Sequence, residues 1–466
     1  MKKIVLSMAG VLAATAFAPE ASAIPAFARQ TGLACSSCHY QHYPVLSTTG
    51  QEFKVGAYTQ LSAKGKFKGE DLSIPDQLNA AILLKARYQK TSGADAAGTV
   101  SGTTTNGGQW QIPDELSLFF GGRIGDNGMI KMGFMNENNM VGGPAGGIIA
   151  GLKVPVAIAL DPVTVQVIPY GTDALGMAYG FEQSSTGMTR GVRWAEHRNE
   201  ISAAQYTGLG SGTASGIAYV VNSDMGYVNI SKWSPAFFYV AGATGVQMSN
   251  TWVRVAATPT IADWALHIGF GQASGSGYTD NGVTKVDTKG QVFDVQAQGV
   301  IAEMETSFYF QNAKATKSDA GAATANLFNA STVADKTATT IGADFSVIPH
   351  TLHIGVAYRS AKTGGADAVA ATAAQNVGSF DPVTGLPIVT VVPGTAAKAA
   401  RASESDNALT VTAVYDLFQN VALHANYSMY SGSAYNAGGA KDAVTTKADG
   451  SKGSKSLLTL MLEAAW

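Results

Sequence analysis

The chain has 466 residues, a formal net charge of −2 and only two cysteines. A charge balance this close to neutral argues against nucleic acid as a partner. Only 14% of the residues are charged, glycine occurs 53 times, and no apolar run after the N-terminal segment is long enough for a helical membrane span. The composition therefore excludes a helical membrane protein and leaves soluble domains or a β-structure.

Residues 1–23 have the features of a secretory signal peptide. Lys2 and Lys3 form a basic start, residues 4–18 are mostly apolar, and Ala21-Ser22-Ala23 offers a cleavage site. The apolar part is too short and wrongly flanked for a membrane-spanning helix. We therefore expect an exported protein whose mature chain begins at Ile24.

Both cysteines occur in Cys35-Ser36-Ser37-Cys38-His39, the attachment signature of c-type haem. At such sites two thiols form thioethers to the haem and the adjacent imidazole ligates its iron. The motif predicts one covalently bound haem, held by Cys35 and Cys38, with His39 as the proximal ligand on a short helix over residues 34–41. The alternative is a redox-active C-x-x-C with an accidental histidine. No strand–helix pattern of the thioredoxin kind surrounds the motif, and the export signal favours haem attachment.

The expected haem segment, residues 24–69, is too short to build an adequate core unaided. We expect the haem to serve as most of that core and the segment to pack against the rest of the protein. The side chains expected to pack on the haem are Phe27, Tyr40, Tyr43, Leu46 and Phe53. Residues 64–71 are polar and contain glycine, which is typical of a linker.

From residue 79 onward the sequence alternates between apolar and polar positions, which predicts β-strands. The pattern is clear at residues 79–89, 114–124, 303–311 and 351–359. Tight turns are expected at residues 125–128, 259–262, 348–350 and 418–420. Long polar loops are expected at residues 91–108, 275–288, 315–337, 362–405 and 432–454. The last strand, residues 455–466, would direct Leu458, Leu460, Leu462, Ala464 and Trp466 outward.

A soluble sandwich would also alternate, but the long uninterrupted repeat and the regular exchange of short turns and long loops favour a transmembrane barrel. We expect residues 70–466 to form an all-β outer-membrane barrel of about 16 antiparallel strands, with 18 as the alternative. Up to 18 segments fit the pattern, and the two least certain are residues 152–160 and 163–170, which have little charge and several prolines nearby. This hairpin could instead fold into the lumen as a plug, which would leave the even number of 16 strands. An even strand number places both barrel termini and the haem segment at the periplasmic end, with long loops extracellular and the haem segment as a plug.

The sequence leaves the sixth ligand of the haem iron open. His267, His353 and His424 fall on lumen-facing positions near short turns, so any of them could supply a distal imidazole. A methionine such as Met129, Met132 or Met135 is the competitor, and would raise the redox potential relative to a second histidine. His42, three residues after His39 on the expected helix, points from the same side and is better explained by a haem-propionate or solvent contact.

The N-terminal motif resembles the monohaem cytochrome–porin fusions in the outer membrane of iron-oxidising bacteria. The resemblance covers residues 25–54 and rests on residues 25–32, on Cys35, Cys38 and His39, and on Gln41, Pro44, Leu46, Gly50, Phe53 and Lys54. It implies a haem in the mouth of a roughly 16-stranded barrel, with Cys35 and Cys38 holding it and His39 ligating its iron. It further implies oxidation of extracellular Fe(II) and transfer of the electrons to periplasmic c-type cytochromes. The remaining residues resemble that family in architecture only.

Two other functions remain alternatives at the level of sequence. The protein could be a solute porin in which the haem is a structural or sensory plug, or it could pass electrons outward to an extracellular acceptor. Ferric products precipitate near neutral pH, so a cell gains by oxidising iron outside and importing only the electron. This favours the inward direction as the working hypothesis.

Overall fold

The structure is a computed structural model, and it describes most of the chain. The described residues are 25–62, 66–68, 73–75, 79–91, 108–140, 149–188, 202–237, 247–279, 282, 284–368, 375–380, 387–392, 399–418, 420–436 and 456–466. The expected signal peptide lies outside them. Within these ranges, no helix combines the length and apolarity needed to cross a membrane.

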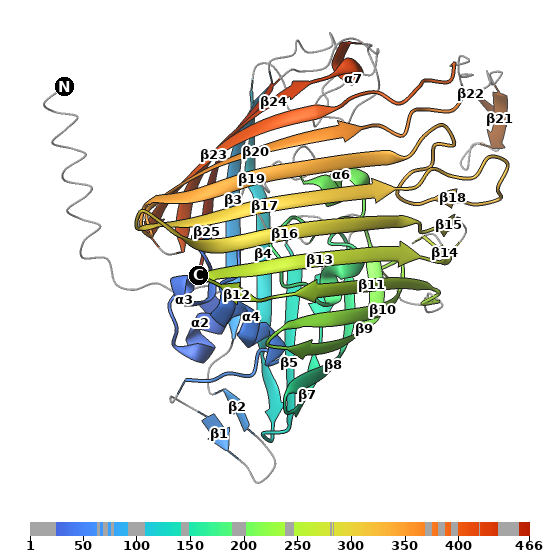
Figure 1. The fold of residues 1–466 in the computed structure, drawn as a ribbon. Coiled ribbons are helices and arrows are strands. Elements are labelled where there is room, and N and C mark those ends of the chain that lie inside the picture. Colours follow the sequence, from blue (N-terminus) through green and yellow to red (C-terminus); the bar gives the residue numbers. More distant parts are fainter. Residues whose placement is uncertain are drawn as a thin grey trace, which may run out of the picture.

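The wall of the molecule is a closed antiparallel β-barrel (Figure 1). Its segments are β3 (Ala80–Thr91), β4 (Gln109–Asp126), β5 (Ile130–Asn139), β6 (Ile149–Lys153), β7 (Val156–Leu160), β8 (Val163–Thr172), β9 (Ala214–Ser223), β10 (Gly226–Ser234), β11 (Asn250–Ala257), β12 (Thr260–Ile261), β13 (Trp264–Ser274), β16 (Gly290–Ile301), β17 (Met304–Ala315), β19 (Lys336–Ile348), β20 (Leu352–Lys362), β23 (Asn407–Phe418), β24 (Val421–Ser431) and β25 (Ser456–Ala465). β6 and β7 together fill one place between β5 and β8, and β12 continues β11. The wall therefore has 16 strands, as expected, and β25 closes it by pairing with β3.

Short turns and long loops alternate between successive strands, as predicted. The four predicted tight turns link β4 to β5, β12 to β13, β19 to β20 and β23 to β24, and all lie at one end of the barrel, here called the short-turn end. The strands that flank the predicted long loops end at the opposite end, here called the long-loop end; of these loops, residues 92–107, 369–374, 381–386, 393–398 and 437–454 lie outside the described residues. Small elements lie at the long-loop end, namely β14 (Ser276–Tyr278), β15 (Lys285–Asp287), β18 (Ala325–Asn326), β21 (Gln375–Phe380), β22 (Pro387–Val392) and α7 (Ser433–Asn436).

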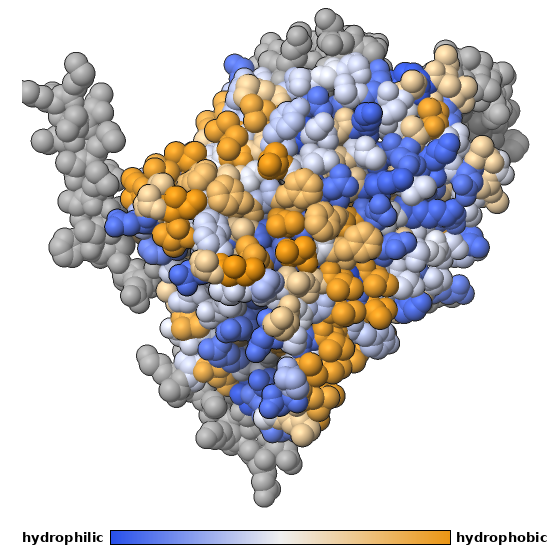
Figure 2. Space-filling view, in the orientation of Figure 1, coloured by the Kyte–Doolittle hydropathy of each residue, from blue (hydrophilic) through white to orange (hydrophobic). Residues whose placement is uncertain are grey.

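The two faces of the wall differ in the way that the alternation predicts. On β20, Ile354 and Val356 are exposed on the outside, whereas His353 and Arg359 are buried inside. The last strand repeats the pattern, with Leu460 and Leu462 exposed and Glu463 buried. Figure 2 shows apolar side chains gathered over the strands, with hydrophilic residues concentrated toward the long-loop end. An apolar outer band around a polar interior is typical of barrels that lie in lipid.

The hairpin over residues 152–170 belongs to the wall, so the alternative that it folds into the lumen is wrong. β8 pairs with β9 over nine residues, and Val167 is exposed on the outer face. The low charge of this stretch suits its inner face, which packs against buried side chains rather than water. Lys153 donates a hydrogen bond to the Tyr179 carbonyl (2.9 Å), and the Tyr170 hydroxyl donates to the Met177 carbonyl (2.8 Å).

A different segment, the connection from β8 to β9, fills the lumen. Its described parts include η2 (Met177–Gly180) and α6 (Ala203–Thr207), short helices where a continuous run of strands was expected. The backbone N–H of Ala204 donates to Gln311 on β17 (2.7 Å), and the Tyr206 hydroxyl donates to Asp406 (3.1 Å). Phe181, Leu209, Trp233 and Trp252 are fully buried around this segment. These contacts hold the segment against the inside of the wall.

Three short helices lie at the short-turn end, where the C-terminus also lies (Figure 1). They are α2 (Pro25–Thr31), α3 (Cys35–Cys38) and α4 (Thr48–Val55). The Gln41 side chain donates to the backbone carbonyls of Glu305 and Asp344, at 2.9 Å each, and the Gln298 amide donates to the Leu46 carbonyl (3.2 Å). Beyond these helices, β1 (Lys66–Lys68) and β2 (Ser73–Pro75) form a two-stranded hairpin at the place of the expected linker. Residues 25–62 are thus bonded to the inside of the wall.

Candidate functional site

The two cysteines occupy the single turn of α3, between two bends of the backbone. His39 is extended (φ −115°) and its N–H bonds to the Cys35 carbonyl (2.9 Å), so the helix ends at Cys38. Gln41 then adopts a left-handed conformation (φ 62°). The helix predicted over residues 34–41 was therefore too long, because the chain turns sharply toward the wall at Gln41. The two thiols are not joined in a disulfide.

The His39 imidazole is held in one tautomer by the backbone. Its Nδ1 lies 3.2 Å from the Val45 carbonyl. A carbonyl oxygen only accepts, so Nδ1 carries the proton and Nε2 keeps its lone pair. Desolvation lowers the pKa of His39 to about 4, so the ring is neutral near pH 7. The Tyr43 ring packs edge-on against it, with centroids 5.3 Å apart. His39 is therefore in the state in which an imidazole binds a metal.

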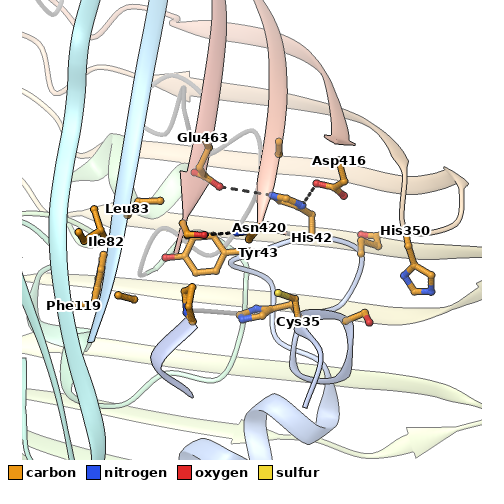
Figure 3. Close-up of a pocket in the computed structure, with 17 residues that line it drawn as sticks. Cys35, His42, Tyr43, Ile82, Leu83, Phe119, His350, Asp416, Asn420 and Glu463 are labelled. Carbon is orange, nitrogen blue, oxygen red and sulfur yellow. Dashed lines mark hydrogen bonds and ion pairs between the residues drawn. The ribbon is translucent and has the colours of Figure 1, made fainter. Parts of the chain in front are cut away.

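Cavities open on both sides of this motif. One, of about 840 Å³ with the solvent it opens to, is lined by Cys35, His39 and Tyr43 and is shown in Figure 3. The other, of about 1240 Å³, is lined by Cys38, His39 and Tyr43. Its remaining wall includes the apolar side chains Phe27, Leu33, Leu46, Phe53 and Tyr58. Phe27 contacts Phe53 and Tyr58 with ring centroids 5.1 and 5.2 Å apart. This cavity is largely apolar, although Lys54, Glu137, Lys153 and Glu182 also line it. Together with two thiols and a neutral imidazole, it fits a haem tethered at this motif.

Gly50 explains why α4 can lie directly against α3. A Cβ added at Gly50 would come within 2.1 Å of the Cys38 carbonyl oxygen, a distance that no side chain tolerates. Ser47 caps α4 by accepting from the Gly50 N–H (3.3 Å) and donates its own hydroxyl to the Ser37 carbonyl (2.8 Å). The glycine and the serine together hold the cysteine turn against the next helix.

The histidines proposed as distal ligands lie in two separate places. His267 on β13 is buried beside Asp294 and lines a different cavity, together with Glu52. His353 and His424 lie on β20 and β24, close to His42. Of the competing methionines, Met135 lines the cavity that Cys38 and His39 share, whereas Met129 lies exposed in a tight turn.

His42 does not share a helix with His39, so the premise that both rings point from one side is wrong. The bend at Gln41 turns His42 toward the wall, where its Nδ1 lies 2.6 Å from Asp416 and its Nε2 lies 3.8 Å from Glu463 (Figure 3). The centroids of the His424 and His353 rings are 5.6 and 6.1 Å away. His42 thus belongs to a group of three histidines and two carboxylates. Alternation alone places four of these side chains in the lumen, but only the bend brings His42 to them.

Lys54 on α4 joins the helices to the segment in the lumen. Its ammonium donates a hydrogen bond to the Glu182 backbone carbonyl and lies 5.9 Å from the Phe181 ring centroid. Desolvation lowers the pKa of Lys54 to about 8, and the nearby Glu182 charge opposes this only in part. Below pH 8 the charged form is therefore kept at a cost to stability.

That cost should disappear as the pH rises. Between about pH 8 and pH 10 the folded protein has lost the Lys54 proton while the unfolded chain still holds it, so the free energy of unfolding should increase by about 1.4 kcal/mol per pH unit at most. Comparing urea unfolding of the protein with that of Lys54→Met over pH 7–10 isolates this contribution. A difference between the two that does not change with pH would contradict the expectation.

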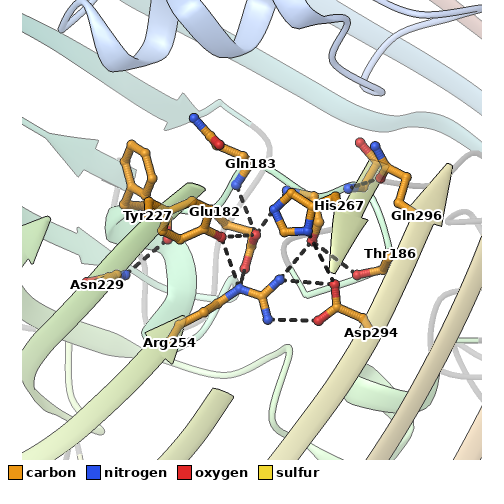
Figure 4. Close-up of polar contacts among 12 residues, drawn as sticks. Glu182, Gln183, Thr186, Tyr227, Asn229, Arg254, His267, Asp294 and Gln296 are labelled. Carbon is orange, nitrogen blue, oxygen red and sulfur yellow. Dashed lines mark hydrogen bonds and ion pairs between the residues drawn. The ribbon is translucent and has the colours of Figure 1, made fainter. Parts of the chain in front are cut away.

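A second buried polar group, which sequence reasoning missed, fixes the lumen segment to the wall (Figure 4). Arg254 on β11 lies 2.6 Å from Glu182 through Nε, and it donates two hydrogen bonds to Asp294 on β16 at 2.7 and 3.0 Å. The side chains of all three residues are completely buried. The Tyr227 hydroxyl adds a hydrogen bond to Glu182 (2.7 Å). Alternation marks Arg254 and Asp294 as inward-facing, but nothing in the sequence pairs them with Glu182.

No family model matches the chain, and no curated protein matches it either. Several solved structures are similar to it. OmpT, an outer membrane protein of Vibrio cholerae, has 12% identity and a TM-score of 0.45 over 86% of this chain and 100% of its own. The outer membrane channel DcaP of Acinetobacter baumannii gives the same values. An anion-selective porin from Comamonas acidovorans has 13% identity and a TM-score of 0.43 over 83% of this chain and 98% of its own. These similarities are weak, and the barrel assignment stands on the strand pairing described above.

Proposed function

We propose that the protein carries one covalent c-type haem at Cys35, Cys38 and His39, and that it transfers electrons from Fe(II) across a bacterial outer membrane. One observation carries the proposal. Directly after two thiols in a single helical turn, an imidazole is fixed by the Val45 carbonyl with its Nε2 lone pair available. This is the donor set that a covalently attached haem requires.

The proposed location follows from the surface of the barrel. An outer face of apolar side chains on a closed antiparallel wall suits lipid, and the last strand is followed by the exposed aromatic side chain of Trp466. In bacterial barrels the short turns are periplasmic. On this basis, residues 25–62 would face the periplasm and the long loops the outside.

When bound, the haem would supply one-electron chemistry at its iron. The chain's own residues hold and shield it. Cys35 and Cys38 tether it, His39 Nε2 ligates its iron, and Val45 keeps the imidazole in the ligating tautomer. Phe27 and Phe53 add apolar surface to the cavity beside the motif. Fe(II) is the proposed electron donor, and a periplasmic c-type cytochrome, reached from the short-turn end, is the proposed acceptor.

The test uses holoprotein extracted from the membrane and oxidised beforehand. Adding Fe(II) without oxygen should produce the reduced haem α-band, with about one haem reduced per Fe(II) consumed. In proteoliposomes loaded with a soluble c-type cytochrome, external Fe(II) should reduce the trapped cytochrome only when holoprotein is present. If Fe(II) leaves the haem oxidised while another small donor reduces it, iron is not the donor.

The second candidate is a solute porin in which the haem is a structural or sensory plug. It is favoured by the barrel itself and by a cavity at the level of α6, of about 1850 Å³ with the solvent it opens to, whose lining includes Arg359 and Asp406. Sugar flux separates the two functions. Rapid swelling of the same proteoliposomes in sugar solution, with no reduction of the trapped cytochrome, would favour the porin. Reduction of an external acceptor by an internal donor would instead support outward electron transfer.

A further inference from the structure

We propose that His42, His424 and Glu463 form a second metal site, which binds Fe(II) beside the haem-attachment motif. The proposal rests on the proposed function, because it names the place where the donor of that function binds. One donor atom of each residue lies within 4.8 Å of the other two. The three side chains come from distant parts of the chain, namely the loop after α3 and strands β24 and β25.

The distances within the group suit ligands of one ion better than hydrogen bonds. The Glu463 Oε1 atom lies 3.8 Å from His42 Nε2 and 3.9 Å from His424 Nε2. Ligands that bind a first-row metal at about 2.0–2.2 Å lie about 3–4.4 Å from one another, depending on the angle at the ion. A separation of 3.8 Å is too long for a hydrogen bond. An ion between these three atoms would therefore need little movement of the side chains.

His42 is oriented by a carboxylate, as metal-binding histidines usually are. Its Nδ1 lies 2.6 Å from Asp416 Oδ1, and Asp416 Oδ2 lies 2.9 Å from His353 Nε2. Both separations are hydrogen-bond lengths, too short for two ligands of one ion. Asp416 and His353 are therefore positioning residues. With its Nδ1 proton donated to Asp416, His42 presents the Nε2 lone pair toward Glu463 and His424.

Charge and burial support a cation at this place. The side chains of His42 and Glu463 are 10% and 7% exposed, and that of His424 is fully buried. Lys85 is the nearby positive charge, but its ammonium lies closer to Glu115 (2.9 Å) than to the other oxygen of Glu463 (3.6 Å). Asp416 adds a second carboxylate next to the group. The place thus holds two carboxylates, Glu463 and Asp416, together with one lysine that lies closer to Glu115.

The chemistry of the donors selects the kind of ion. Two imidazoles and one carboxylate with open positions form the set typical of non-haem Fe(II), whereas Mg²⁺ and Ca²⁺ prefer oxygen ligands. The site adjoins the motif, because His42 and Glu463 line the same cavity as Cys35 and His39. Fe(II) held here would lose one electron to become Fe(III), and the ferric haem of the proposed function would take up that electron.

The experiment measures binding separately from electron transfer. The haem of the holoprotein is first reduced with dithionite, so that Fe(II) has no oxidant. After equilibration with ⁵⁷Fe(II) without oxygen and removal of free iron, Mössbauer spectra should show one high-spin Fe(II) per haem, since haem iron of natural isotope abundance contributes little. Glu463→Gln and His424→Gln should each weaken this binding at least tenfold. His350→Asn should bind as the unchanged protein does, because His350 lines the same cavity outside the group.

Each other outcome is informative. If the unchanged protein retains no iron beyond its haem, or if both Gln variants retain as much as His350→Asn, the site does not exist. If Fe(II) binds as expected but oxidised haem is not reduced by it, the metal site stands and the proposed function fails. If the haem is reduced by Fe(II) although no iron binds at the site, the function stands without this site. Gel mobility of unheated samples shows whether each variant is folded, and His424→Gln leaves Lys85 and its carboxylates in place.

Discussion

Replacing Cys35 and Cys38 together with serine is expected to abolish covalent haem attachment completely while leaving the barrel folded. The thiols are the only two in the chain, so no other residue can form a thioether. The barrel is held by strand pairing that does not involve α3. Haem staining of a denaturing gel should therefore show no signal for the double variant, and the unheated sample should still migrate as a folded barrel.

Ser36→Ala is the matched control for the cysteine variant. Ser36 lies in the same helical turn and lines the same cavity as Cys35, so its replacement changes the turn without removing a thiol. It should keep a full haem stain. A stained band that survives denaturation in the double cysteine variant would show that haem is attached elsewhere or in another way. The proposed attachment at Cys35 and Cys38, on which the proposed function depends, would then be wrong.

Arg254→Met is expected to destabilise the protein by about 3–5 kcal/mol and to loosen the packing of the lumen. The guanidinium bonds both Glu182 and Asp294 where no water reaches them, so its removal leaves two carboxylates buried without their cation. Glu182 belongs to the segment that fills the barrel. Urea unfolding should therefore begin at lower concentration, and the ion conductance of the variant in planar bilayers should exceed that of the unchanged protein.

A surface ion pair provides the comparison for Arg254. Lys314 on β17 lies 2.7 Å from Asp335, but both side chains are at least one-third exposed. Lys314→Met should cost no more than about 1 kcal/mol and leave the conductance unchanged, because water replaces the lost partner. Equal effects of the two substitutions would mean that the Arg254 group does not fasten the lumen segment.

The strand pattern was predictable from the sequence because a membrane-type barrel wall imposes a strict two-residue period. Every second residue must suit the outer face, so the exposed Ile354 and Val356 and the buried His353 reveal their orientations in a single strand. The turns and long loops were predictable for the same reason, since a strand that crosses a wall of fixed height must end after about ten residues. The place of the hairpin over residues 152–170 could not be predicted from its low charge, because its inner face contacts protein rather than water.

The candidate site was only half predictable. Cys35, Cys38 and His39 are adjacent in the sequence, and their chemistry is visible there. The position of His42 was not predictable, because it depends on the left-handed bend at Gln41 and on the hydrogen bonds that Gln41 makes with the wall. Helical spacing was the natural assumption for a residue three positions after His39, and the early end of α3 removed its basis.

The sequence by itself determined the local features of this protein: which residues alternate, where strands end, and which residues form the C-x-x-C-H motif. These depend on neighbours along the chain and on the period of the backbone. Only the tertiary structure decided which segment fills the barrel, that Arg254 bonds Glu182, and that His42 lies beside His424 and Glu463. The physical reason is that closing the barrel brings β25 against β3 and sets the loop after α3 inside the wall, so contacts between distant residues depend on closure and not on any local pattern.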